Sequence, residues 1–99
     1  MAKGILYVES RPESEAAAAA FHQWYEHTHM KEMLGLDGVV AARRVAPVTG
    51  DGPYVAVYEL EADDIESVRT QLSEATKAGT LSAPVGVRTD PPPLVCFYR

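Results

Sequence analysis

Three residues of one segment, Tyr25, His29 and Glu32, have the types and the spacing of an acid–base site. On an α-helix, steps of four and three residues bring their side chains to neighbouring turns of one face. A histidine titrates near neutral pH, so His29 can take or deliver a proton while Tyr25 or Glu32 fixes its tautomer. We therefore expect His29 and Tyr25 to be catalytic. The structural alternative is a histidine satisfied in the core or at its rim, with Glu32 in solvent.

Residues around this group could form the walls of a binding site. At about 100° per residue, Trp24 and Thr28 fall on the same half of the helix, where polar groups interrupt the apolar stripe. An arginine of the 43–44 pair would suit a carboxylate, phenolate or enolate, and a surface ion pair is the alternative. Strand tyrosines can line an aromatic pocket, although they often belong to a core or an interface. The substrate-binding residues that we expect are Trp24, Thr28, Glu32, Tyr7, Arg43 and Tyr58.

Metal and cofactor chemistry find less support. His22, Glu26 and His29 share one helix edge at a spacing that could hold a divalent metal, but a good site requires a further ligand from elsewhere in the chain. Cys96 lies in a predicted strand without a cationic neighbour, which is typical of a small buried hydrophobe. The sequence has no glycine-rich phosphate loop and no dinucleotide fingerprint. We therefore predict no metal and no cofactor.

The elements that must position these residues can be read from periodicity and from turn signals. Apolar, β-prone runs predict strands at 4–9, 39–46, 54–60 and 94–98. A capping pattern at Ser10–Glu13 predicts a long helix that ends at Gly35, and Asp63-Asp64 predicts a second helix that ends at Gly79. A turn-rich stretch at 49–53 predicts a hairpin. Residues 80–93 contain four prolines and predict an ordered loop or edge segment.

The order of these elements predicts one α+β domain over residues 1–99. The pattern βαββαβ is ferredoxin-like, with a four-stranded antiparallel sheet and two helices on one face. Both faces of the strands carry apolar residues, so the helix-free face would be a large exposed apolar patch. The simplest cover is a second copy packed about a two-fold axis, which predicts a homodimer.

Composition narrows the classes of partner. The 99 residues are 46% hydrophobic and 23% charged, which is an ordinary globular balance. A formal net charge of −5 and the lack of a long basic run argue against nucleic acid. No window approaches the roughly 18 consecutive apolar residues of a membrane span, and no signal-peptide pattern is present. One cysteine cannot form an intramolecular disulfide, so we predict a cytoplasmic location.

The segment Phe21-His22-Gln23-Trp24-Tyr25-Glu26-His27-Thr28-His29, followed by Met33-Leu34 and by Gly38–Arg44, resembles the EthD-like branch of the dimeric α/β-barrel superfamily. The resemblance implies a ferredoxin-like protomer, two of which pair their sheets into a barrel. It also implies that His29 lies at the pocket with Tyr25 beside it. Family patterns often carry a proline soon after this histidine, whereas Met30-Lys31-Glu32 has none.

That superfamily includes cofactor-free cyclases, isomerases, dehydratases and decarboxylases, together with monooxygenases and haem-binding branches. We therefore expect an enzyme that acts on an aromatic or polyketide-like metabolite by cyclisation, dehydration or isomerisation. One alternative is a non-catalytic metabolite-binding or stress-related module. A further alternative is a cofactor-free or haem-assisted monooxygenase.

Overall fold

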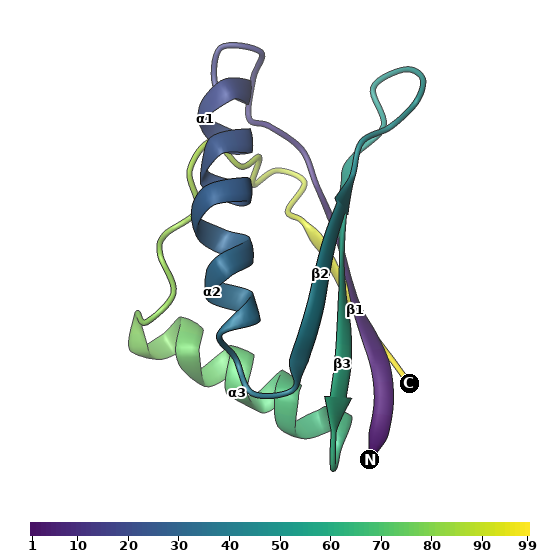
Figure 1. The fold of residues 1–99 in the computed structure, drawn as a ribbon. Helices are drawn as coiled ribbons and strands as arrows, with labels where there is room; N and C mark the ends of the chain where they lie inside the picture. The colour runs from purple at the N-terminus through teal and green to yellow at the C-terminus, as the bar shows by residue number, and fades with distance from the viewer.

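The computed structural model describes residues 1–99, whose helices and strands alternate along the chain. They are, in order, β1 (Ala2–Ser10), α1 (Ala18–Trp24), η1 (Tyr25–His29), α2 (Met30–Leu34), β2 (Val39–Val45), β3 (Tyr54–Ala62), α3 (Ile65–Ala78) and β4 (Leu94–Tyr98). The segments α1, η1 and α2 form one continuous helix, and α3 lies across its lower end (Figure 1). None of these helices is both long and apolar enough to cross a lipid bilayer.

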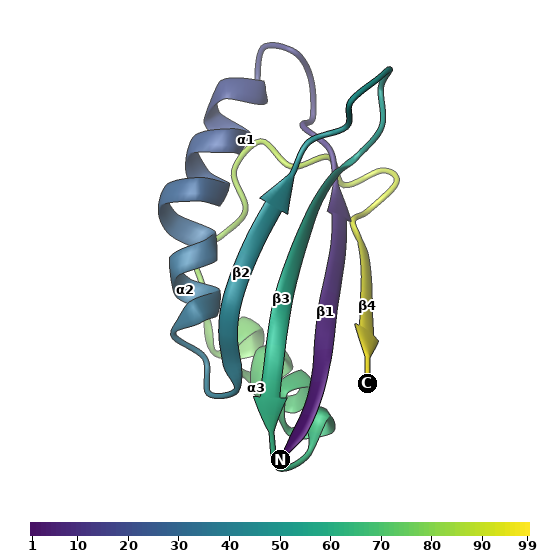
Figure 2. The ribbon, with the colours of Figure 1, turned by 45° about the vertical axis from the view of Figure 1, so that its right-hand side comes forward.

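The strands form one antiparallel sheet in the order β2-β3-β1-β4 (Figure 2). β1 lies between β3 and β4, so that Leu6 pairs with Tyr58 on one side and with Phe97 on the other. Both helices cover the same face of the sheet (Figure 1). The predicted α+β class and the four-stranded antiparallel sheet are therefore confirmed, and this arrangement is compatible with a ferredoxin-like fold.

The first helix begins later than the sequence pattern predicts. Ser10, the predicted cap, is instead the last residue of β1, where it pairs with Tyr54 and is only 6% exposed. The hydroxyl of Ser14 accepts a hydrogen bond from the backbone N–H of Ala17 at 3.1 Å, and regular helix starts at Ala18. The helix starts late because β1 keeps a backbone partner on β3 along its whole length, so that the strand continues into the capping pattern.

The other predicted boundaries fit the structure more closely. The carboxylate of Asp64 accepts a hydrogen bond from the backbone N–H of Glu66 at 3.0 Å and caps α3, which ends at Gly79 with φ 72°. Strand β4 has the predicted bounds, while β3 runs on to Ala62 and β2 stops at Val45. Residues 79–93 form no regular element and run from α3 along the helix before they return to β4 (Figure 1).

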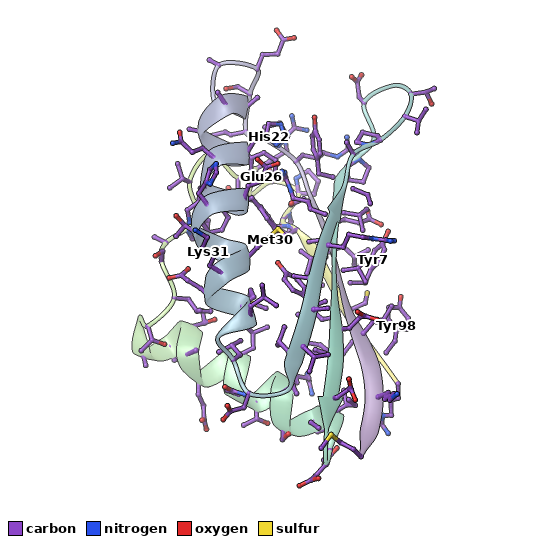
Figure 3. The ribbon with its side chains drawn as sticks, viewed as in Figure 1. Tyr7, His22, Glu26, Met30, Lys31 and Tyr98 are labelled. Carbon is purple, nitrogen blue, oxygen red and sulfur yellow. The ribbon has the colours of Figure 1, made fainter.

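The core lies on one side of the sheet only. Its largest fully buried side chains are Tyr58, Phe21, Leu6, Leu60 and Val68. Strand alternation sends the intervening residues to the opposite face, where Figure 3 shows Tyr7 and Tyr98 pointing away from the helices. No helix or loop of the chain covers that face (Figure 1). The sheet therefore separates a packed layer from an open apolar surface.

The turn into β2 supplies a test of this packing. Gly38 has φ +91°, and a Cβ atom there would lie 2.8 Å from Cγ2 of Val68. The change Gly38→Ala should therefore reduce the free energy of unfolding by about 2–4 kcal/mol, through left-handed strain and a clash with α3. Gly50 is the matched control, because its φ is +68° but no atom lies within 4 Å of the added Cβ. Gly50→Ala should cost about 1 kcal/mol in a urea titration, and equal losses would contradict the packing argument.

Candidate functional site

A cavity of about 220 Å³ lies between the helix-covered face of the sheet and the first helix. Its sheet side is formed by Leu6, Val8, Ser10, Tyr58 and Val95. The first helix contributes Trp24, Tyr25, His29 and Met33. Leu72 and Thr76 of α3, with Leu81, Pro84, Val87 and Pro93 of the following loop, complete the lining. The cavity is therefore mostly apolar, with a few polar groups that come from the first helix and from the sheet.

A π-helical turn at η1 presents the histidine to this cavity. In a regular α-helix, residues five apart point about 140° away from each other. Across η1, however, the rings of Trp24 and His29 are stacked, with centroids 4.6 Å apart and planes at 19°. The ring of Tyr25 meets that of His29 edge-on at 5.1 Å. One local change of helix type thus positions the three ring side chains, Trp24, Tyr25 and His29, that line the cavity.

The same turn explains which helix residues leave the site. Met33 is only 2% exposed and lines the cavity, whereas Thr28 and Glu32 are half-buried and do not. The carboxylate of Glu32 accepts hydrogen bonds from the backbone N–H and the hydroxyl of Ser82, at 3.0 and 2.8 Å. The expectation that Thr28 and Glu32 line the site is therefore not met. The wider turn rotates the residues after Tyr25, and Glu32 anchors the 79–93 loop instead.

Three polar atoms of the lining residues are buried without a hydrogen-bond partner. They are Nε1 of Trp24, Nδ1 of His29 and the hydroxyl oxygen of Tyr58. Such atoms are rare in folded proteins, because each lost hydrogen bond costs about 1–3 kcal/mol. All three belong to residues that line one cavity, but the atoms themselves have almost no surface open to it, so these side chains would have to rotate to meet a bound molecule.

Burial sets the protonation states at this cavity. It lowers the pKa of His29, an effect that the negative charge of Glu32 partly opposes, so the imidazole is neutral at pH 7. Burial raises the pKa of Tyr58 and of Tyr25, and for Tyr25 the nearby hydroxyl groups of Tyr58 and Ser10 act in the opposite direction. At neutral pH the site thus offers one proton acceptor beside two phenols that can donate.

Strand alternation removes two of the predicted binding residues from the cavity. Tyr7 lies on the open face, where its hydroxyl donates to the carboxylate of Glu9 at 2.9 Å (Figure 3). Arg43 pairs with Val57 on the same face and is exposed. Neither side chain can reach the cavity within one chain. The expectation that Tyr7 and Arg43 line it is therefore not met. In the alternation of their strands, both side chains lie on the face of the sheet opposite to Leu6 and Tyr58.

Arg44, the other member of the pair, faces the helices and lies against the ring of Tyr25. Its guanidinium carbon is 4.6 Å from the centroid of that ring and 5.0 Å from those of Phe21 and Tyr54. It also donates to Nδ1 of His22 at 3.0 Å and forms a 3.6 Å ion pair with Glu26. Figure 3 shows His22 and Glu26 on the helix flank that faces the sheet. Arg44 thus packs against the ring of Tyr25, a residue that also lines the cavity.

The residues considered for a metal site lie apart from one another. His22 contacts Arg44 at one edge of the helix, whereas His29 turns into the cavity on the other side of Tyr25. No group of three or more histidine, cysteine or carboxylate side chains in the chain is close enough to hold a metal ion. The lone Cys96 is half-buried on the open face, beside Tyr7.

Several lining residues were missed by the sequence patterns. Ser10 was assigned to a helix cap, and the loop residues Leu81, Pro84 and Val87 were assigned to an irregular segment. The only sequence signal of the loop residues is that they are apolar side chains in a proline-rich stretch, and Ser10 has no such signal. Tyr58 was proposed for the site and does line it, together with Trp24, Tyr25 and His29.

Because the pKa of His29 is lowered in the folded chain, the free energy of unfolding should depend on pH. A histidine whose pKa is lower in the folded chain stabilises it fully above the unfolded pKa of 6.5 and loses that contribution as the pH falls below it. We expect the free energy of unfolding to fall between pH 7.5 and 5.5, and to fall less in His29→Gln. The exposed His27 is the control, and His27→Gln should keep the wild-type slope. Urea titrations at several pH values measure this, and an unchanged slope in His29→Gln would refute it.

Known proteins provide no guide to this site. A scan against protein-family models finds no match, and searches of curated proteins and of solved structures find none either. A function for this chain is therefore inferred from the cavity and from the residues that surround it.

Proposed function

We propose that this chain binds a small, mostly apolar aromatic or polyketide-like molecule in the cavity and promotes a proton transfer on it. The volume of about 220 Å³ exceeds the roughly 150 Å³ of an engineered cavity that binds benzene, so one or two rings fit. The apolar lining would hold the rings, and the few polar atoms would orient an oxygen substituent. His29 is the base and Tyr25 is the assisting donor.

The observation that carries this proposal is the stacking of Trp24 on His29 across the η1 turn. A π-helical turn costs hydrogen-bond geometry, and such turns are frequent at functional sites. Here the turn takes a titratable ring to a place where burial keeps it neutral, and it leaves two of the stacked pair's nitrogen atoms without partners. Titratable groups with shifted pKa values in a cavity are typical of active sites.

The chemistry that this arrangement supports is enolisation. The neutral imidazole of His29 accepts a proton from a carbon next to a carbonyl group, and the electron pair moves onto the carbonyl oxygen. A hydrogen bond from the hydroxyl of Tyr25 or Tyr58 would stabilise that oxygen as it gains negative charge. The imidazolium then returns the proton to another carbon, which completes an isomerisation, or to a departing hydroxyl group, which completes a dehydration.

A second candidate is a binding protein without catalysis, and the composition of the lining favours it. No lining residue carries a carboxylate that could pair with the imidazolium during a reaction. The carboxylate of Glu32, the nearest candidate, is engaged by Ser82. In this role the unpartnered atoms of Trp24, His29 and Tyr58 would serve recognition alone.

One pair of variants separates these two functions. If the protein is an enzyme, His29→Gln should reduce kcat by about 10²–10⁴-fold and change ligand affinity little, since a general base acts mainly in the transition state. Turnover of a panel of polyketide-like ketones measures the first quantity. Fluorescence of Trp24, the chain's single tryptophan, measures the second. His27→Gln should behave as wild type, and binding without turnover in every form would favour the binding module.

We propose further that two copies of the chain pair their open sheet faces, as in the EthD-like dimeric α/β barrels that the sequence resembles. The open face carries Ile5, Val55 and Val57 on its two central strands and Val45, Leu94, Cys96 and Tyr98 on its edge strands, with the charged Glu9, Arg43 and Glu59 among them. Contiguous exposed apolar residues of this kind are typical of protein–protein contact surfaces. The βαββαβ order and the sheet order β2-β3-β1-β4 are compatible with that pairing.

Light scattering tests the dimer. We expect a particle of twice the chain mass of 10.8 kDa for the wild type and a monomer for Val57→Lys, which would bury a charge at the centre of the paired faces. Val48→Lys is the control, because Val48 is 98% exposed in the β2–β3 turn. A wild type that remains monomeric at micromolar concentration would contradict the proposal.

A further inference from the structure

Two half-buried arginines, Arg11 and Arg88, oppose each other near the upper end of the cavity. An isolated β-bridge joins Pro12 to Val87, and the backbone N–H of Arg88 donates to the carbonyl oxygen of Arg11 at 2.9 Å. Residues 11 and 88 are therefore direct neighbours across this short ladder. Like charges in such positions repel, so the local structure keeps two cations together at a cost.

No carboxylate of the chain forms an ion pair with Arg11 or Arg88, although both arginines also line a second hollow of about 450 Å³ together with Glu15 and Asp51. The three ion pairs in the structure use Arg44, Arg69 and Arg99. Arg11 donates to the backbone oxygen of Asp51, which is a neutral partner. Arg11 and Arg88 are thus two cationic side chains without an ion pair in a chain whose net charge is −5.

The nearest acid of the hollow between them is also engaged elsewhere. Arg11 and Arg88 both line a hollow of about 250 Å³, to which Glu9 contributes as well. The carboxylate of Glu9, however, accepts the hydrogen bond from Tyr7 on the open face of the sheet. The hollow therefore offers two guanidinium groups and no opposing charge paired with them.

This hollow adjoins the cavity of the proposed function. Ser10 and Pro93 line both spaces, so the two lie side by side with these residues between them. Ser10 is 6% exposed, and its hydroxyl lies close to that of Tyr25. A molecule with its rings against His29 and Trp24 could extend past Ser10 toward the arginines.

We propose that the ligand of the cavity is an aromatic acid, whose carboxylate binds between Arg11 and Arg88. A guanidinium group is planar and matches a carboxylate with two parallel hydrogen bonds, and two such groups would share the anion. Binding would relieve the repulsion between the two cations. This inference rests on the proposed function, since it names the chemical class of molecule that the cavity takes.

A matched pair of probes tests the charge requirement. Naphthalene-2-carboxylate and its neutral carboxamide have the same rings, and calorimetry at low salt gives the affinity of each. We expect the wild type to bind the carboxylate at least about ten-fold more tightly, as for hydrogen bonds to a charged group. Arg11→Gln and Arg88→Gln should each remove most of that preference and leave the affinity for the carboxamide unchanged.

Two further variants keep this test decisive. Arg43→Gln removes the same charge from the open face, and it should preserve the preference because Arg43 lines neither space. Arg88→Lys keeps the charge and should retain part of the preference, even if the glutamine variants fold poorly. Thermal unfolding of each variant reports its folding.

The outcomes separate the two proposals. If the wild type binds both probes equally, or if Arg43→Gln loses the preference as fully as Arg88→Gln, the arginine site is refuted and the aromatic cavity stands. If the preference survives in both glutamine variants, the site is refuted as well. If neither probe binds and the fluorescence of Trp24 does not change, the proposed function falls together with this inference.

Discussion

The contact between Trp24 and His29 across the η1 turn determines how the first helix borders the cavity. A straight α-helix would direct these two rings about 140° apart and would leave His29 beside the packed layer. The π-helical turn instead brings His29 and Met33 to the cavity and sends Glu32 to Ser82. The same turn therefore places the imidazole of His29, shapes one wall of the cavity and fixes the loop that lines it. A change in helix type has three consequences for the site.

The alternation of side chains along the strands places the other polar residues on two different faces of the sheet. Leu6, Ser10 and Tyr58 face the helices and belong to the cavity, while Tyr7 and Arg43 face the open side. Because alternate residues point in opposite directions, one strand can serve both the cavity and a partner surface without compromise. A dimer formed through the open face would leave the cavity of each copy intact. The proposed ligand site and the proposed dimer contact would therefore use opposite faces of one sheet.

The sequence predicts where the helices and strands of this fold lie better than it predicts which of their side chains face the cavity. Alternation and caps locate the strands and α3 because those signals are local. These signals do not predict the η1 turn, because projection at a constant 100° per residue assumes an unbroken α-helix. That assumption places Thr28 and Glu32 inside the site, where the structure has Met33. Strict alternation from the buried Val39 would turn Arg43 toward the helices, but the register irregularity between Val39 and Ala41 reverses that phase, so that Arg44 faces them instead.

A chain selected only for stability would have little reason to keep this site. It holds Trp24, His29 and Tyr58 with buried polar atoms that lack partners, at about 1–3 kcal/mol for each. It also sets Arg11 opposite Arg88 without an ion pair for either of them. Smaller apolar side chains at the same positions would remove both costs. Unfavourable groups of two kinds thus lie around neighbouring hollows, and the ligand that we propose would offset the cost of both, which packing within the chain does not.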